Sequence, residues 1–321
     1  MIFRIFFIQM HKVKNMDVSI IIVNYNTREI TKNCLLSIYE KTQEINFEVM
    51  VSDNGSKDGS QDMIRTEFPQ VTLIENNANL GFGTANNRAL AVAKGKYVFY
   101  LNSDTILLNN AAKIFFDYWE NAVDKDTIGA LGANLLDAQG HIIHSYGGFP
   151  DIDSVMKDTI KALYGTSKLT LLNVIFKRLL PICNQNQYAE KKMGQVDYIT
   201  GADLFLKNDE YAYFDERYFM YCEETDLQYR FARQGKKRLL IDGPKIIHLN
   251  GASSKKNTPD TVHLFSNVSS IYNNLSRIYF FRKHGANRFK IFIIKTVLFF
   301  IWLNPLLFPK TKHYIPELLK T

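Results

Sequence analysis

The sequence predicts an α/β fold in which a doubly wound, mostly parallel sheet is flanked by helices. A continuous β-branched run at residues 18–23 lacks period-2 alternation, which is typical of a strand buried on both faces. Strand-like and helix-like segments then alternate at βαβ spacing through the first half of the chain. Composition agrees, because 46% hydrophobic and 22% charged residues exclude a disordered, collagen-like or disulfide-stapled chain of 321 residues.

The elements of the first half follow in order. Strands are expected at residues 18–23, 47–52, 71–75 and 97–101. Helices are expected between them and after the last one, at residues 27–41, 61–68, 84–94 and 111–121. Residues 53–60 form a polar turn, and Pro69 ends the second helix.

The second half is less regular. Residues 128–149 are expected to be extended around a turn at 137–140, whereas residues 151–195 show no clear pattern. Regularity returns at 196–206, at a helix over 224–233 that Gly235 ends, and at a strand over 239–247. Apolar residues recur at helical spacing from residue 262, and residues 291–308 are the most apolar run in the protein.

Positive charge is concentrated in the C-terminal stretch. The chain has 39 Lys and Arg against 32 Asp and Glu, and eight of the basic residues lie between Asp260 and Glu317, where no carboxylate occurs. Because the same stretch is rich in Phe, Ile and Leu, an anionic membrane surface is the expected partner, and nucleic acid is not. The run at 291–308 contains Lys295 and Pro305 and is slightly short for a span. We therefore expect a peripheral or monotopic helix on the cytoplasmic face of the inner membrane.

The domain prediction has three parts. Residues 1–15 are a leader or an upstream start, with Met16 an adequate start. Residues 16–260 form the main body, with halves of about 16–125 and 126–260, and residues 261–321 form amphipathic and apolar helices. The three cysteines contain no C-x-x-C pair, which argues against a zinc ribbon or a disulfide framework and fits a reducing cytosol: Cys34, Cys183 and Cys222.

Polar residues follow four of the expected strands. They stand at 24–27, 53–56, 76–83 and 102–104. Ligands of doubly wound sheets bind beyond the carboxyl ends of the strands, so amides and carboxylates gathered there suit a nucleotide. Taken singly, each of these segments is equally an ordinary turn rich in Asn, Asp and Gly.

Two nucleotide-binding classes are disfavoured. A dinucleotide site needs G-x-G-x-x-G after the first strand, but Asn24-Tyr25-Asn26 stands there, and Gly81-Phe82-Gly83 has Asn86 in place of the third glycine. No P-loop motif occurs. A nucleotidyltransferase would need a Gly-rich, basic loop after the first strand, which residues 24–27 do not provide.

Two residues are candidate metal ligands. Asp104 ends a buried strand, where an acid can hold a divalent cation against a diphosphate, although it could equally cap the next helix. His248 also ends a strand-like segment and could add a nitrogen ligand, although a lone histidine is more often structural.

Residues 214–227 place several acids between aromatic side chains. Such packing removes water from carboxylates and raises the pKa, which suits a general base. The alternative is that Glu223, Glu224 and Asp226 complement the N-terminus of the following helix, and both interpretations can hold.

Together these segments resemble glycosyltransferase family 2, the inverting transferases with the GT-A fold, and within it the rhamnosyltransferase-like enzymes of bacterial surface polysaccharide and O-antigen synthesis. The matching segments stand in family order at residues 18–26, 51–56, 76–87, 101–105, 201–202, 214–227 and 248–253. The similarity covers roughly residues 17–285.

The resemblance implies roles for particular residues. Asp53 would read the nucleotide base, and the nucleotide-sugar pocket would comprise Asn24, Tyr25, Asp53, Asn54, Gly81, Asn87, Ser103 and Asp104. Asp104 and His248 would bind Mg²⁺ or Mn²⁺, with Asn102 at the first position of the D-x-D motif. Glu224 would be the catalytic base, with Glu223 the other candidate. The acceptor side would include Gly201, Ala202 and Asp226.

The implied reaction is a single displacement from a nucleoside-diphosphate sugar, dTDP- or UDP-linked, to a growing glycan or a lipid-linked acceptor. The alternative is a catalytically silent, membrane-bound sugar-nucleotide-binding protein that scaffolds an assembly complex. The acids at 104, 224 and 226 argue for the enzyme.

Overall fold

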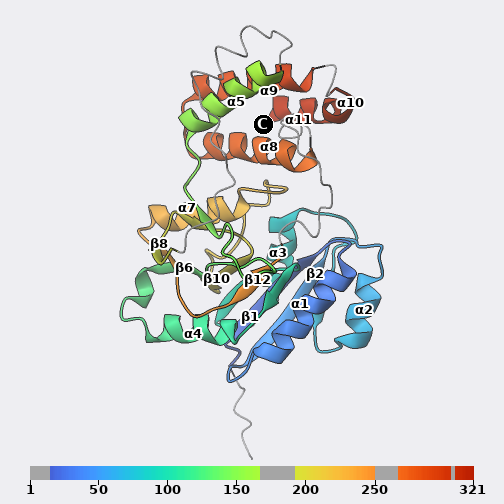
Figure 1. Cartoon of the computed structure of the whole chain (residues 1–321), viewed down its shortest axis with the longest axis vertical. Coiled ribbons are helices and arrows are strands. Elements are labelled where there is room, and N and C mark those ends of the chain that lie inside the picture. Colours follow the sequence, from blue (N-terminus) through green and yellow to red (C-terminus); the bar gives the residue numbers. More distant parts are fainter. Residues whose placement is uncertain (1–14, 167–191, 250–266, 305–307) are drawn as a thin grey trace, which may run out of the picture.

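The computed structural model describes residues 15–166, 192–249, 267–304 and 308–321, and it consists of an α/β domain with a helical region above it (Figure 1). The predicted leader, Cys183, Gly251 and part of the unpatterned stretch lie outside these residues. The first half of the α/β domain contains β1 Val18–Asn24, α1 Arg28–Lys41, β2 Phe47–Asp53, α2 Ser60–Glu67, β3 Thr72–Glu75, α3 Phe82–Leu90, β4 Tyr97–Asn102, β5 Thr105–Leu107, α4 Ala111–Asn121, η1 Lys125–Thr127 and β6 Ile128–Gly132.

The elements after β6 complete the α/β domain and form the helical region. They are β7 Tyr146–Gly147, α5 Ile152–Thr166, β8 Gly194–Gln195, β9 Tyr198–Ile199, β10 Asp203–Lys207, α7 Glu223–Arg233, β11 Lys237–Leu240, β12 Ile246–His248, α8 Val268–Lys283, α9 Arg288–Trp302, α10 Phe308–Thr311, η3 Lys312–Tyr314 and α11 Ile315–Lys320.

The main sheet has the order β3-β2-β1-β4-β10-β6-β11-β8, and its first four strands run parallel to one another. Ile20 and Ile22 pack with the helices on one face, and Ile21 packs with those on the other. The predicted strand buried on both faces is therefore confirmed, and with it the mostly parallel α/β fold. β10 enters antiparallel between β4 and β6, so the second half of the sheet is mixed.

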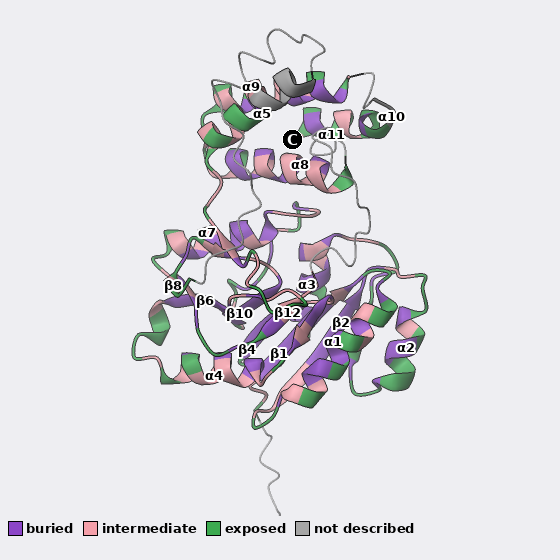
Figure 2. Cartoon of the chain, viewed as in Figure 1, coloured by how far each residue is buried: buried purple, intermediate pink, exposed green. Residues whose placement is uncertain are grey.

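Each face of the sheet has its own helices. Residues of α1, α2 and α4 form one core cluster with the sheet, and residues of α3 and α7 form the other. Figure 2 shows the buried residues of α1 and α3 turned towards the strands. Because α3 and α7 lie on the same face, the segments before them meet at one edge of the sheet.

The helical region includes a segment that the sequence left unassigned. Residues 152–166, within the unpatterned stretch, form α5, and Ile152, Val155 and Met156 pack on the cluster that α8, α9 and α11 build. This helix had been placed in the 126–260 half of the main body, yet it lies beside α9 (Figure 1). Its apolar face is short and its partner is distant in sequence, so no local pattern marked it.

The apolar run at the C-terminus is divided between two environments. Ile294, Leu298 and Trp302 of α9 are buried inside the helical region, so much of the run serves internal packing. Phe289 and Phe292 on the other face are 70% and 63% exposed. Within the described ranges, none of the helices combines the length and the hydropathy needed to cross a bilayer.

Candidate active site

The carboxyl ends of β1 and β2 are joined by one buried hydrogen bond. Asn24 Nδ2 donates to Asp53 Oδ1 over 2.6 Å. The other carboxylate oxygen of Asp53 accepts from the Gly55 and Ser56 amides and from Gln61 Nε2 at 2.6 Å. Asp53 is fully buried, so in this conformation it shapes the 53–56 loop, and its contact with a base stays a prediction.

Asn24 also fixes the start of α1. Its Oδ1 accepts from the hydroxyls of Thr27 and Thr31, both over 2.7 Å. Every polar atom of the Asn24 side chain is therefore used within the protein. Tyr25 differs, because its ring is 48% exposed at the rim and is available to a ligand.

The loop before α3 is held against the 214–222 segment. Asn54 Nδ2 donates to the Gly81 carbonyl at 3.2 Å, and the Phe82 amide donates to the Phe219 carbonyl at 3.1 Å. Gly81 has φ +87°, and a Cβ there would lie 2.3 Å from the Phe219 oxygen. Only glycine permits this approach, so Gly81 brings the two segments together.

Asn87 has a different position from the one expected. Its Nδ2 donates to the Phe214 carbonyl and its Oδ1 accepts from the Phe214 amide, both over 2.9 Å, while Glu216 accepts a further bond at 3.0 Å. The side chain is buried. Asn87 therefore fastens the acidic segment to α3, and its place in a sugar-nucleotide pocket stays a prediction.

Asp104 and His248 are brought together by a two-stranded ribbon. β12 pairs antiparallel with β5, His248 opposite Thr105, and His248 Nε2 lies 3.2 Å from Asp104 Oδ1. Both side chains are largely buried, with 14% and 8% exposed, respectively. Ser103 lies nearby, its hydroxyl 3.5 Å from that of Thr27. The sequence identified the two residues but not the ribbon that pairs them.

These two donors fit a divalent ion bound mainly by its substrate. Across the described residues, no three or more His, Cys, Asp or Glu side chains cluster as a complete metal cage. A carboxylate and an imidazole leave the other coordination positions to diphosphate oxygens and water, which is how Mg²⁺ is commonly held.

The acids of α7 begin after an uncommon backbone conformation. Tyr221 and Cys222 have φ of +69° and +65°, which turns the chain sharply into the helix. Glu223 is buried, and its Oε2 has no hydrogen-bond partner. Burial and then the neighbouring Glu224 charge raise the Glu223 pKa well above its usual range. Its surroundings therefore favour the protonated form of Glu223 more than water does.

Glu224 lies on the more accessible side of the same turn. Burial raises its pKa above the usual value, while hydrogen bonds from Thr225 and from backbone amides oppose the rise. A Cβ on Gly201 would stand 3.6 Å from Glu224 Cβ. The next residue, Ala202, accepts a hydrogen bond from the Asn102 amide at 3.1 Å. The pair Gly201 and Ala202 thus spans the distance from Glu224 to the strand that ends before Asp104.

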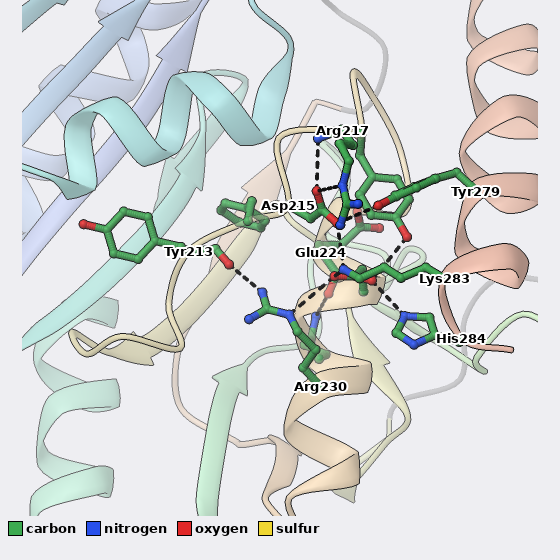
Figure 3. A network of polar contacts seen from close by, with 12 residues as sticks. Tyr213, Asp215, Arg217, Glu224, Arg230, Tyr279, Lys283 and His284 are labelled. Carbon is green, nitrogen blue, oxygen red and sulfur yellow. Dashed lines mark hydrogen bonds and ion pairs between the residues drawn. The ribbon is translucent and has the colours of Figure 1, made fainter. Parts of the chain in front are cut away.

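Asp226 is not on an open surface, contrary to its expected place on the acceptor side. It is fully buried, with Lys283 Nζ at 2.7 Å, His284 Nε2 at 2.8 Å and Arg230 Nε at 3.4 Å (Figure 3). The Tyr218 hydroxyl donates to it as well. Asp226 therefore fixes α7 to α8 and makes no contact open to an acceptor.

The sequence analysis did not identify the roles of two residues of α8 and of His284, which follows it. Ser276 Oγ donates to the Met220 carbonyl at 2.8 Å, and Lys283 and His284 bind Asp226. Lys283 also binds Asp215 at 2.8 Å. The only local signal is the basic end of the helix, which does not reveal partners so distant in sequence.

Comparison with known proteins agrees with this architecture. Residues 19–138 match the model of the family described as Glycosyl transferase family 2. The N-acetylglucosaminyl-diphospho-decaprenol L-rhamnosyltransferase of Mycobacterium tuberculosis is 25% identical over 254 residues, which cover 70% of this chain and 73% of the relative.

Two further proteins are similar over different extents. The UDP-Glc:alpha-D-GlcNAc-diphosphoundecaprenol beta-1,3-glucosyltransferase WfaP of Escherichia coli is 32% identical over 122 residues, 35% of this chain and 48% of that one. A mannosyltransferase from Pyrobaculum calidifontis, solved with GDP-Man and Mn²⁺, has a TM-score of 0.50 at 15% identity and covers 95% of this chain and 75% of its own. The structural likeness supports the GT-A fold.

Proposed function

Because this chain is a glycosyltransferase of family 2, we propose that it inverts the anomeric centre as it transfers a sugar from a nucleoside-diphosphate donor to a lipid-linked saccharide or growing glycan of a cell-surface polysaccharide. The observation that carries the proposal is the Gly201–Ala202 connection. It sets a carboxylate of raised pKa beside the strand that leads to the Asp104 and His248 pair. A base and a diphosphate-binding end are what a single displacement requires.

The donor would lie along the carboxyl ends of β1, β2 and β4. Tyr25 offers an exposed ring for the base, and the loop that Asp53 and Asn54 hold offers backbone groups for the ribose and base. Ser103 lies between this loop and Asp104. We propose a dTDP- or UDP-linked sugar.

The diphosphate would lie at Asp104 and His248. A bound Mg²⁺ or Mn²⁺ would neutralise the charge that develops on the leaving diphosphate. The protein's own contribution is to hold the carboxylate and the imidazole in one place, because β5 and β12 fix both backbones.

Glu224 would remove the proton from the acceptor hydroxyl. Its environment lacks the water that would stabilise the anion, so the ionised form is a stronger base than a free carboxylate. The raised pKa of Glu223 favours its protonated form, which would put no second negative charge beside Glu224. The attacking oxygen and the leaving diphosphate would then act on opposite sides of the anomeric carbon.

A lipid-linked acceptor would reach the protein at a membrane surface, and we propose that α9 lies on the cytoplasmic face of the inner membrane. Its outer face carries large exposed apolar side chains over almost its whole length: Phe289, Phe292, Phe300 and Leu303. Anionic lipid would attract the basic residues around it, although Lys283 and Lys290 are already paired with Asp215 and Asp153.

Vesicle flotation tests this surface. Replacing Phe289, Phe292 and Phe300 by Ser should weaken binding to anionic vesicles by at least about tenfold, since a buried Phe contributes roughly 1.5–3 kcal/mol. Val123→Ser removes an exposed apolar side chain of the α/β domain and should change nothing. Unchanged flotation of the triple variant would remove α9 from the membrane contact.

The reaction itself is tested by a donor screen. Purified protein is incubated with single nucleotide sugars and Mn²⁺ or Mg²⁺, with and without a lipid-linked saccharide, and release of nucleoside diphosphate is measured together with the product's anomeric configuration. We expect one donor to give acceptor-dependent release and inversion. Specific donor binding without transfer to any acceptor would instead favour the sugar-nucleotide-binding scaffold.

A further inference from the structure

Helix α8 is fixed against the segment that precedes the catalytic acids. Ser276 Oγ donates to the Met220 carbonyl at 2.8 Å, and the rings of Tyr272 and Phe219 lie 4.7 Å apart. Further along, the Tyr279 hydroxyl donates to Asp215 at 3.1 Å. The residues of α8 around Ser276 therefore have a defined position beside the start of α7.

Arg277 follows Ser276 in α8, at the part of the helix that is fixed beside the 215–222 segment. Burial raises the pKa of Tyr198 to about 12, the Glu224 charge adds to the rise, and the Arg277 charge opposes it. The pKa of the Cys222 thiol is shifted by the same groups. Burial raises it most, the Glu224 charge raises it further, and the Arg277 charge lowers it. The charges of Arg277 and of the proposed base therefore act in opposite directions on the pKa of the same two side chains.

The guanidinium of Arg277 differs from its neighbours in having no partner. Arg217 is paired with Asp215 at 2.8 Å, and Arg230 is 3.4 Å from Asp226 (Figure 3). Arg277 is half-buried, and among the described residues no carboxylate, carbonyl or aromatic ring binds its guanidinium. A partly buried cation without a partner is unfavourable, and an anionic ligand would relieve that cost.

Resting on the proposed function, we propose that Arg277 binds a phosphate of the diphosphate that joins the acceptor saccharide to its lipid. A guanidinium pairs with a phosphate through two parallel hydrogen bonds, and it stays charged at any working pH. The donor's diphosphate is assigned to Asp104 and His248 on the sheet side, which leaves the α8 side for the acceptor. Helix α8 also leads directly into α9, whose exposed phenylalanines form the proposed membrane contact.

Two acceptors that differ only in the diphosphate test the proposal. One is a short-chain prenyl diphosphate-linked saccharide, and the other is an alkyl glycoside of the same saccharide. Arg277→Ala should raise the KM for the diphosphate acceptor by at least tenfold and leave the KM for the donor unchanged. With the alkyl glycoside, the variant and the wild type should have equal KM. Arg277→Lys keeps the charge but loses the paired hydrogen bonds, so its KM should be intermediate.

Arg282→Ala is the matched control. It removes an arginine of the same helix that bonds the Lys320 carbonyl at the far end, and it should leave both KM values unchanged. Thermal melting of each variant shows whether the fold is retained, and Arg277→Lys supplies the comparison if the alanine variant unfolds. Equal effects of Arg277→Ala on both acceptors, or a raised donor KM, would overturn the assignment. A wild-type protein that transfers to neither acceptor would overturn the proposed function as well, which separates the two failures.

Discussion

Asn24 and Asp53 at the ends of β1 and β2 and Glu223 at the start of α7 are all buried, yet they differ in how completely they are hydrogen-bonded. Asn24 and Asp53 use every side-chain hydrogen-bonding atom on protein partners. Glu223 has an oxygen without a hydrogen-bond partner, and the Arg277 guanidinium of α8 has no partner among the described residues. The first region is complete in itself and holds loops in place, whereas the second needs a ligand to complete it.

The residues that match the family pattern therefore have different tasks in the two regions. In the nucleotide half, the motif residues mainly build the rim on which a donor would lie. At α7 and α8, one carboxyl oxygen of Glu223 and the guanidinium of Arg277 have no partner among the described residues, and polar groups left unsatisfied in this way are the ones that bind and react. Substitutions in the first region should therefore reduce stability, and those in the second should reduce turnover.

The largest effect is expected for Glu224→Gln. The variant keeps the size of the side chain but cannot accept the proton, so the transfer rate should fall by about 10² or more with donor affinity nearly unchanged. Single-turnover transfer and donor titration measure the two quantities. A wild-type transfer rate for this variant would show that Glu224 is not the catalytic base. The start of α7 would then have no identified reactive residue.

Next comes the metal pair. Asp104→Asn should weaken the activation by Mn²⁺ by about 10- to 100-fold, and His248→Ala should act in the same direction but less strongly, because the carboxylate supplies the charge. Metal titrations of the transfer rate give both values. Full activity of the wild-type protein in excess chelator would contradict this prediction for both residues.

Asn24→Ala tests the self-contained region. It removes the partner of Asp53 Oδ1 and one buried hydrogen bond each from the Thr27 and Thr31 hydroxyls, so the free energy of unfolding should fall by about 2 kcal/mol, and the melting temperature by roughly 4–8 °C. Tyr25→Ala, at the exposed neighbouring position, should leave the melting temperature unchanged. Equal melting temperatures for Asn24→Ala and wild type would show that the network is not what holds the rim.

Glu223→Gln should have the smallest effect on activity, because glutamine resembles the protonated acid. The folded protein holds its proton at pH values where the unfolded chain has lost it, so stability is full below about pH 4.5 and declines as pH rises through the raised pKa. The variant should lose this decline and melt no lower than wild type at neutral pH. A fall in transfer as large as that of Glu224→Gln would reverse the roles of the two acids.

Much of the α/β half could be predicted, since buried parallel strands and their polar ends leave a local signal in residues 18–24 and 97–104. Asp104 and His248 were found through the family pattern, and the ribbon of β5 and β12 shows how they meet. The roles of Asn87, Asp226 and α5 were not predictable. Their partners lie far along the chain, and the spacing of one segment carries no information about the face that another presents.

The packing of α5 on α9 also has a consequence for how the chain is made. A ribosome completes α5 well before α8 and α9. The apolar side chains of Ile152, Val155 and Met156 therefore stay exposed to solvent until these later helices have emerged and can pack on them. The α/β half has its own core by then and can fold ahead of the helices. Nascent chains arrested before Arg288 should therefore be cut by protease within α5 while the sheet is already resistant.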